Sequence, residues 1–134
     1  MKARVFVATA KGDDPLRVEE IRQQVVARMP EATVVDGLAD WQENFHRCGG
    51  WNGWIEDVAV GRELGGRYRY DAFVAPYTSL GRATAQILQR AIECGKPVVH
   101  ITRNGDVSRV VGVECVDFES WKAGWTLVTD SPTR

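Results

Sequence analysis

The sequence predicts an α/β protein with a three-layer, Rossmann-like fold. Short β-branched segments alternate with longer segments of helical periodicity, and glycines or prolines separate them. Small, polar loops follow two of the apolar segments, as expected where a strand gives way to a helix. Such alternation is typical of a parallel sheet with right-handed crossovers. We therefore expect a mostly parallel five-stranded sheet in the order 2-1-3-4-5, with helices on both faces.

The first third of the chain predicts a complete strand–helix–strand unit. Residues 4–8, RVFVA, form the first expected strand. Asp14 suits an N-cap and Pro15 the first position of the helix that follows, where a missing N–H costs nothing. Its buried face carries apolar residues at three- and four-residue spacing, namely Val18, Ile21, Val25 and Met29. Residues 32–36, ATVVD, form the second expected strand.

Residues 37–69 form a tryptophan-rich insert before the third strand. Two segments within it are predicted to be helical, with Gly49-Gly50 between them and Gly65-Gly66 after them. Three of the five tryptophans fall here, namely Trp41, Trp51 and Trp54. The third strand is expected over residues 71–76, and Asp71 at its start is expected to serve the beginning of that strand.

The rest of the chain adds two strands and two helices. The helix after Gly81 presents one apolar side and ends at Gly95, a suitable C-cap, before a fourth strand over 97–101. Asn104-Gly105 indicates a tight turn. Residues 109–116, RVVGVECV, predict a fifth strand, with an antiparallel edge as one possibility. Asp117 then suits the N-cap of a last helix that contains Trp121 and Trp125.

Length and composition indicate one soluble globular domain that spans residues 1–134. The formal net charge of −1 argues against binding to duplex nucleic acid through its backbone. No apolar run approaches the ~20 residues of a membrane span, and the N-terminus lacks a signal-peptide pattern. Three widely spaced cysteines argue against a disulfide framework. We expect a cytoplasmic protein.

The strand order predicts a ligand crevice at the carboxyl ends of strands one and three, where the connections diverge. Two loops would line it. From the first we expect contacts by Thr9, Lys11 and Gly12. From the second, and from the helix that it starts, we expect contacts by Ser79, Gly81, Arg82 and Thr84. A helix N-terminus suits phosphate or carboxylate, although these residues are equally typical of an ordinary cap and turn.

The insert supplies further candidates for the site. Trp51 and Trp54 flank Asn52-Gly53 and are suited to stack on a base, with packing in the core as the alternative. Asp57 and Glu63 are the candidates for a general acid or base, with solvated surface carboxylates as the alternative. His46 and Cys48 lack the spacing of a metal site, so no metal and no cofactor are expected.

Several motifs, in order, resemble those of the nucleoside 2-deoxyribosyltransferase-like family, which includes small nucleotide N-glycosidases. They are VFVATAKG at the first strand, DAFVA from Asp71, Ser79-Leu80-Gly81, and Gly95-Lys96-Pro97-Val98 before the fourth strand. The resemblance covers residues 4–36 and 70–101. It implies the same Rossmann-like fold, a nucleoside or nucleotide ligand, and assembly into a homo-oligomer.

The chain departs from this family at its catalytic residue. Catalytic members carry a glutamate nucleophile early in the helix after the glycine-containing loop, where the resemblance implies a covalent glycosyl intermediate. The corresponding helix here reads RATAQIL, and its nearest suitable polar residue is Gln86. An amide is no comparable nucleophile, so the resemblance does not extend to that mechanism.

Three functional hypotheses follow from these residues. The first is binding of a nucleotide or nucleotide-derived ligand without turnover, to sense or sequester it, with Gln86 forming hydrogen bonds in place of a nucleophile. The second is an N-glycosidase or deoxyribosyltransferase in which Asp57 or Glu63 activates water. The third is a protein-interaction module on the same scaffold, with the tryptophans at an interface.

Overall fold

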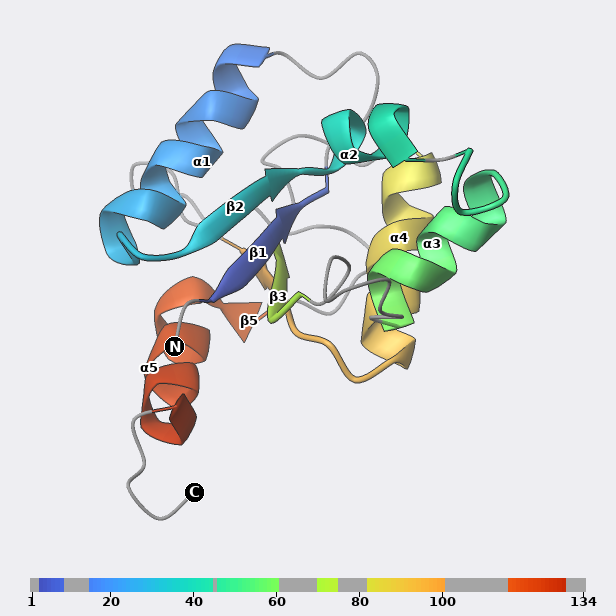
Figure 1. Cartoon of the computed structure of the whole chain (residues 1–134). Coiled ribbons are helices and arrows are strands. Elements are labelled where there is room, and N and C mark those ends of the chain that lie inside the picture. The colour runs from blue at the N-terminus through green and yellow to red at the C-terminus, as the bar shows by residue number, and fades with distance from the viewer. Residues whose placement is uncertain are drawn as a thin grey trace.

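Five strands form a sheet at the centre of the molecule, in the order β2-β1-β3-β4-β5 (Figure 1). The computed structural model describes residues 3–8, 15–44, 46–60, 70–74, 82–100 and 116–129. The strands are β1 (Arg4–Val7), β2 (Thr33–Asp36), β3 (Ala72–Val74), β4 (Val98–His100) and β5 (Val116–Asp117). All neighbouring pairs are parallel. The α/β class and the strand order predicted from the sequence are confirmed.

The fifth strand was predicted with an antiparallel edge as one possibility, and its observed direction corrects this. Val116 of β5 pairs with Val99 of β4 in parallel, so an antiparallel edge is wrong. Of the predicted strand over 109–116, only Val116 lies within the described residues. A run of β-branched residues favours a strand, but its direction depends on the connection that leads to it.

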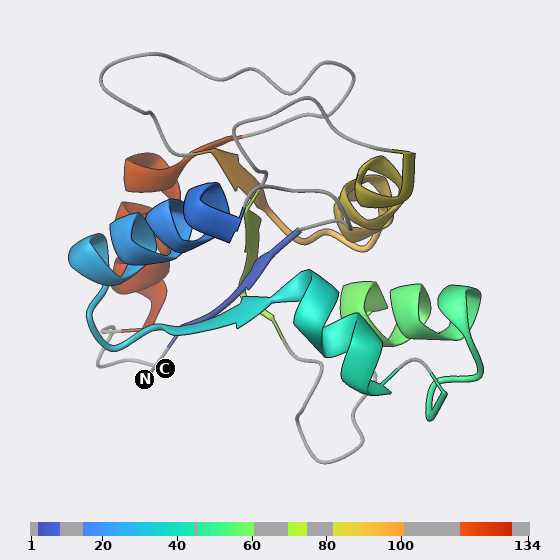
Figure 2. The ribbon, with the colours of Figure 1, turned by 90° about the horizontal axis from the view of Figure 1, so that it is seen from above.

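Two layers of helices enclose the sheet (Figure 2). α1 (Pro15–Arg28) and α5 (Phe118–Thr129) cover one face, while α3 (Trp51–Val60) and α4 (Arg82–Glu93) cover the other, with α2 (Gly37–Asn44) beside α3. α2 and α3 are the two helices predicted in the tryptophan-rich insert. Gly49 and Gly50 between them have φ angles of 80° and 98°, which favour glycine.

Strand side chains alternate between two buried clusters, as the two-residue period of a strand requires. Phe6, Phe73 and Val98 pack towards α3 and α4. Their neighbours pack towards α1 and α5, namely Val5, Val7, Ala72, Val74 and Val99. Because both faces of the sheet are covered there, the central segments Val5–Val7, Ala72–Val74 and Val98–Val99 are apolar on both sides, as expected for the inner strands of a parallel sheet.

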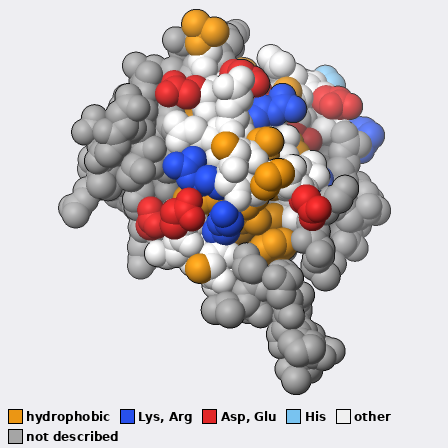
Figure 3. Space-filling model, turned by 90° about the vertical axis from the view of Figure 1, so that its left-hand side faces the viewer, with side chains coloured by type: hydrophobic (Ala, Val, Ile, Leu, Met, Phe, Trp, Pro, Cys, Tyr) orange, Lys and Arg blue, Asp and Glu red, His pale blue; other side chains and the backbone are white. Residues whose placement is uncertain are grey.

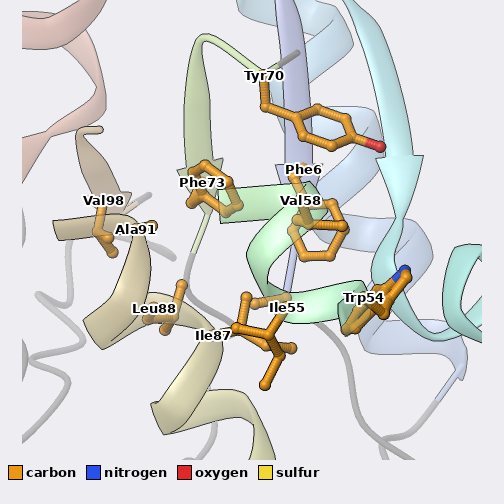
Figure 4. Close-up of a cluster of buried hydrophobic side chains, with 11 residues drawn as sticks. Phe6, Trp54, Ile55, Val58, Tyr70, Phe73, Ile87, Leu88, Ala91 and Val98 are labelled. Atoms are coloured by element: carbon orange, nitrogen blue, oxygen red, sulfur yellow. The ribbon is translucent and has the colours of Figure 1, made fainter. Parts of the chain in front are cut away.

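Phe6 lies at the centre of the cluster under α3 and α4 (Figure 4). Its ring centroid is 5.1 Å from that of Tyr70, 5.3 Å from Phe73 and 6.0 Å from Trp54. These separations are typical of favourable aromatic pairs. Ile55 and Val58 of α3, Ile87, Leu88 and Ala91 of α4, and Ala8 after β1 also belong to the cluster.

Three residues that the sequence predicts at the ends of helices or strands have the expected roles. Asp117 Oδ2 accepts the Ser120 N–H at 3.2 Å and so caps α5. Gly95 has a φ of 77°, and Lys96 N–H bonds back to Ala91 O at 2.9 Å, the pattern of a Schellman cap after α4. Asp71 Oδ2 accepts the backbone N–H of Arg4 at 2.8 Å, so its carboxylate joins the starts of β3 and β1.

Gly53 allows α3 to pack closely on the turn before it. A Cβ atom at this position would overlap the backbone carbonyl of Cys48. We expect Gly53→Ala to lower the free energy of unfolding by about 1–3 kcal/mol, because a backbone atom must move.

The matched control is Gly124→Ala in α5, where a Cβ atom would meet nothing within 4 Å. This change should stabilise the protein by about 0.5–1 kcal/mol, because alanine favours the helix. Urea unfolding of both variants measures the difference. Equal effects of the two substitutions would contradict the proposed contact.

Candidate functional site

The N-terminal ends of α3 and α4 lie at the edge of the sheet where the strands end. α4 runs from the carboxyl end of β3 back to the start of β4, and is therefore antiparallel to the strands. Contacts from Trp51 to Gln86 and from Glu56 to Arg90 show that α3 runs beside α4 in the same direction. Trp51 and Gln86 therefore lie towards the carboxyl-end edge, the side on which open α/β sheets bind ligands.

The loops predicted to line the crevice fall outside the described residues. These are the positions of Thr9, Lys11, Gly12, Ser79 and Gly81, together with the acid candidate Glu63. Arg82 is the first residue of α4; its backbone is described by the structure, but its side chain is not. Their assignment to the site stays a prediction.

Trp51 and Gln86 meet between α3 and α4. The indole Nε1–H of Trp51 donates a hydrogen bond to Gln86 Oε1 at 3.3 Å. Trp51 is half-buried and Gln86 is exposed, so this contact lies at the surface. Two residues that the sequence predicted for the site independently are thus brought together, 35 positions apart in the chain.

The three tryptophans of the insert form one aromatic group. Trp51 contacts both of the others, with ring centroids 6.0 Å from Trp41 in an edge-on pair and 5.5 Å from Trp54 in a tilted pair. Trp54 is only 1% exposed and belongs to the core cluster. The sequence left two interpretations of Trp51 and Trp54, stacking on a base or packing in the core. Trp54 packs in the core, whereas Trp51 keeps access to solvent.

A polar network beneath these rings involves Asp40, which the sequence analysis did not single out. Asp40 Oδ2 accepts the Trp54 Nε1–H at 2.9 Å, and Asp40 Oδ1 accepts from Asn44 Nδ2 at 3.0 Å. Asn44 is fully buried. The four-residue spacing of Asp40 and Asn44 in a predicted helix signals that the two side chains are neighbours. Its connection to Trp54 is visible only in the folded chain.

Comparison with known proteins gives no relative in which these residues could be examined. No family model, curated protein or solved structure matches the chain. The site must therefore be interpreted from its own residues.

The remaining predicted site residues are less well placed for contact with a ligand. Thr84, in the first turn of α4, is 2% exposed and faces the interior. Asp57 is half-buried in α3, six positions after Trp51. At a rise of about 1.5 Å per residue it lies about 9 Å further from the carboxyl-end edge. The geometry does not bring Asp57 to Trp51 and Gln86.

An ion-pair cluster holds α3 and α4 together further along their length. Arg90 binds Glu56 with two parallel hydrogen bonds, Nε to Oε1 and Nη2 to Oε2, both 2.9 Å long. Arg90 Nη1 also donates to Glu93 Oε2 at 3.1 Å. These contacts, chiefly the one with Glu56, raise the pKa of the Arg90 guanidinium above its ordinary value. Such fork-to-fork pairing fixes orientation, and so fixes α3 beside α4.

A hollow of about 180 Å³ lies near the opposite edge of the sheet, between the end of α1 and α5. It is lined by Ala3, Arg28, Met29, Pro30, Glu31, Ala32, Lys122 and Trp125. Arg28 is already bound to Glu119 Oε1 at 3.0 Å and to the backbone carbonyl of Gln24 at 3.1 Å. Figure 3 shows this side of the molecule, where hydrophobic side chains lie among charged ones. The predicted site residues that the structure describes are not part of this lining.

The described ranges contain neither a helix suited to span a membrane nor a metal-binding group. None of the helices there is both long and apolar enough to cross a membrane. No three His, Cys, Asp or Glu side chains in those ranges lie together as a metal-binding group.

Proposed function

We propose that the protein binds a nucleotide or nucleotide-derived ligand at the carboxyl ends of β1 and β3, and holds it without turnover. The observation that carries this proposal is the meeting of Trp51 and Gln86 at the N-terminal ends of α3 and α4. Trp51 supplies an aromatic surface, and Gln86 supplies hydrogen-bonding groups beside it. The pair lies towards the carboxyl ends of the strands, and the general preference of open α/β sheets for ligands at that end supports the proposal.

The proposed ligand class follows from the chemistry of these groups. Aromatic side chains can stack on any nucleobase, because every base has a π-face. The N-terminal end of a helix such as α4 favours anions, which suits a phosphate. The sequence resemblance to the nucleoside 2-deoxyribosyltransferase-like family supports the same ligand class. A base on Trp51 with its phosphate towards the loop before α4 would satisfy all three features.

The absence of turnover in this proposal is supported by the roles of nearby acids. Asp40 accepts hydrogen bonds with both of its oxygens. Asp36 Oδ1 accepts the Leu38 N–H at 3.0 Å at the start of α2. Asp57 lies further along α3, and Gln86 stands where the family resemblance leads one to look for a carboxylate. These roles of Asp36, Asp40 and Asp57, together with Gln86, support binding without turnover, while the other acid candidate, Glu63, lies outside the described residues.

Replacement of Trp51 by leucine tests this function. Leucine keeps an apolar side chain against Trp54 but removes the stacking surface, which contributes about 1–3 kcal/mol per base in comparable sites. We expect the Kd for the best-bound nucleotide, measured by titration calorimetry, to rise at least about fivefold.

Trp121→Leu is the matched control, because Trp121 is also half-buried but packs on Phe118 and Trp125 on the opposite face. It should leave the Kd unchanged. Equal affinity of Trp51→Leu and the unaltered protein would contradict the proposed stacking.

A further inference from the structure

We infer that Gln86 selects for a base that carries a projecting ring carbonyl, as in hypoxanthine, guanine or uracil, over one that carries an amino group there. This inference rests on the proposed function and specifies its ligand. It begins from the single hydrogen bond between Trp51 and Gln86.

That hydrogen bond fixes the orientation of the Gln86 amide. The indole Nε1–H is a donor and cannot accept, so the amide atom that faces it must be the oxygen. Oε1 is accordingly the atom 3.3 Å from Trp51 Nε1. The Nε2 amino group is therefore turned away from Trp51, and it carries two N–H donors.

Among the residues that the structure describes, none engages the amino group of Gln86. Gln86 is exposed, and in the parts of the chain that the structure describes its Nε2 has no hydrogen-bond partner. The neighbouring ion pairs do not reach it, because Arg90 is bound to Glu56 and Glu93. The surface beside Trp51 thus presents donors.

A donor at this position discriminates between bases. A base stacked on Trp51 would direct its edge groups past the indole towards Gln86. A carbonyl oxygen accepts from Nε2–H, whereas an exocyclic amino group would set two donors against each other. The unmatched arrangement leaves a polar group without its hydrogen bond, which costs affinity.

The test compares inosine 5′-monophosphate with adenosine 5′-monophosphate, which carry an oxygen and an amino group at the same projecting position. We expect the unaltered protein to bind the inosine nucleotide about five- to tenfold more tightly in titration calorimetry. Gln86→Glu keeps an oxygen for Trp51 but turns the donor into an acceptor. In this variant the ratio of the two Kd values should fall to one or reverse, even if the added charge weakens both.

Gln89→Glu is the matched control, since Gln89 is exposed on the same helix one turn short of Glu93 and receives the same charge change. Its Kd ratio should equal that of the unaltered protein. A ratio near one in the unaltered protein, or an unchanged ratio in Gln86→Glu, would overturn this inference and leave Trp51-dependent binding standing. Failure of both nucleotides to bind would overturn the inference, and a further failure of all other nucleotides would overturn the proposed function.

Discussion

Phe6→Ala is expected to lower the free energy of unfolding by about 3–5 kcal/mol, the largest effect in this set. Phe6 is fully buried, and its ring contacts three other aromatic rings from two elements of the fold and the segment before β3. Truncation to alanine would leave a cavity that these rigid rings cannot fill without movement of α3. Because a small domain is stabilised by only about 5–15 kcal/mol, the variant should approach unfolding at 37 °C.

Urea denaturation, followed by far-ultraviolet circular dichroism, measures this change. Leu16→Ala removes the same kind of apolar surface from a position that is 79% exposed. It should cost no more than about 0.5 kcal/mol. If the two variants lost similar stability, Phe6 would not be the centre of the core.

Asp40→Ala is expected to lower the free energy of unfolding by about 1–3 kcal/mol, the same range as for Gly53→Ala. The substitution would leave the buried Trp54 Nε1–H without its acceptor and remove one acceptor from Asn44 Nδ2. A buried donor without a partner costs its full desolvation energy, which no apolar contact of an alanine replaces.

A double-mutant cycle with Trp54→Phe identifies the contact responsible. Phenylalanine has no N–H group, so the cost of Asp40→Ala should be smaller by at least about 1 kcal/mol in the Trp54→Phe background. Gln42→Ala, an exposed change on the same helix, is the control and should be nearly neutral. Additive losses in the cycle would show that Asp40 does not act through Trp54.

The architecture could be predicted because several levels of the sequence agree. Alternating strands and helices, Pro15 at a helix start and Gly95 at a helix end all point to the same fold. The parallel pairing of β5 with β4 could not be predicted, because an apolar run does not encode whether its strand runs parallel or antiparallel to the neighbouring strand. Register and direction arise from the connection and from packing.

The candidate site could be predicted only in part. Trp51 was named from the tryptophan-rich insert and Gln86 from the family resemblance. Their hydrogen bond joins different helices and depends on how α3 packs on α4. Trp51 and Trp54 are three residues apart and look alike in the sequence. The fold buries one in the core and leaves the other at the surface. Asp40 was missed because its partner Trp54 is 14 positions away.

The most direct test of the central claim is to incubate stoichiometric protein with a mixed panel of nucleosides, nucleotides, NAD and cyclic dinucleotides. The protein is then separated and denatured, and chromatography identifies the compounds in the released and unbound fractions. Binding without turnover predicts that one compound is recovered intact from the protein fraction, and that Trp51→Leu recovers less of it. Free base or sugar phosphate in the unbound fraction would contradict the claim, and would identify the protein as a glycosidase instead.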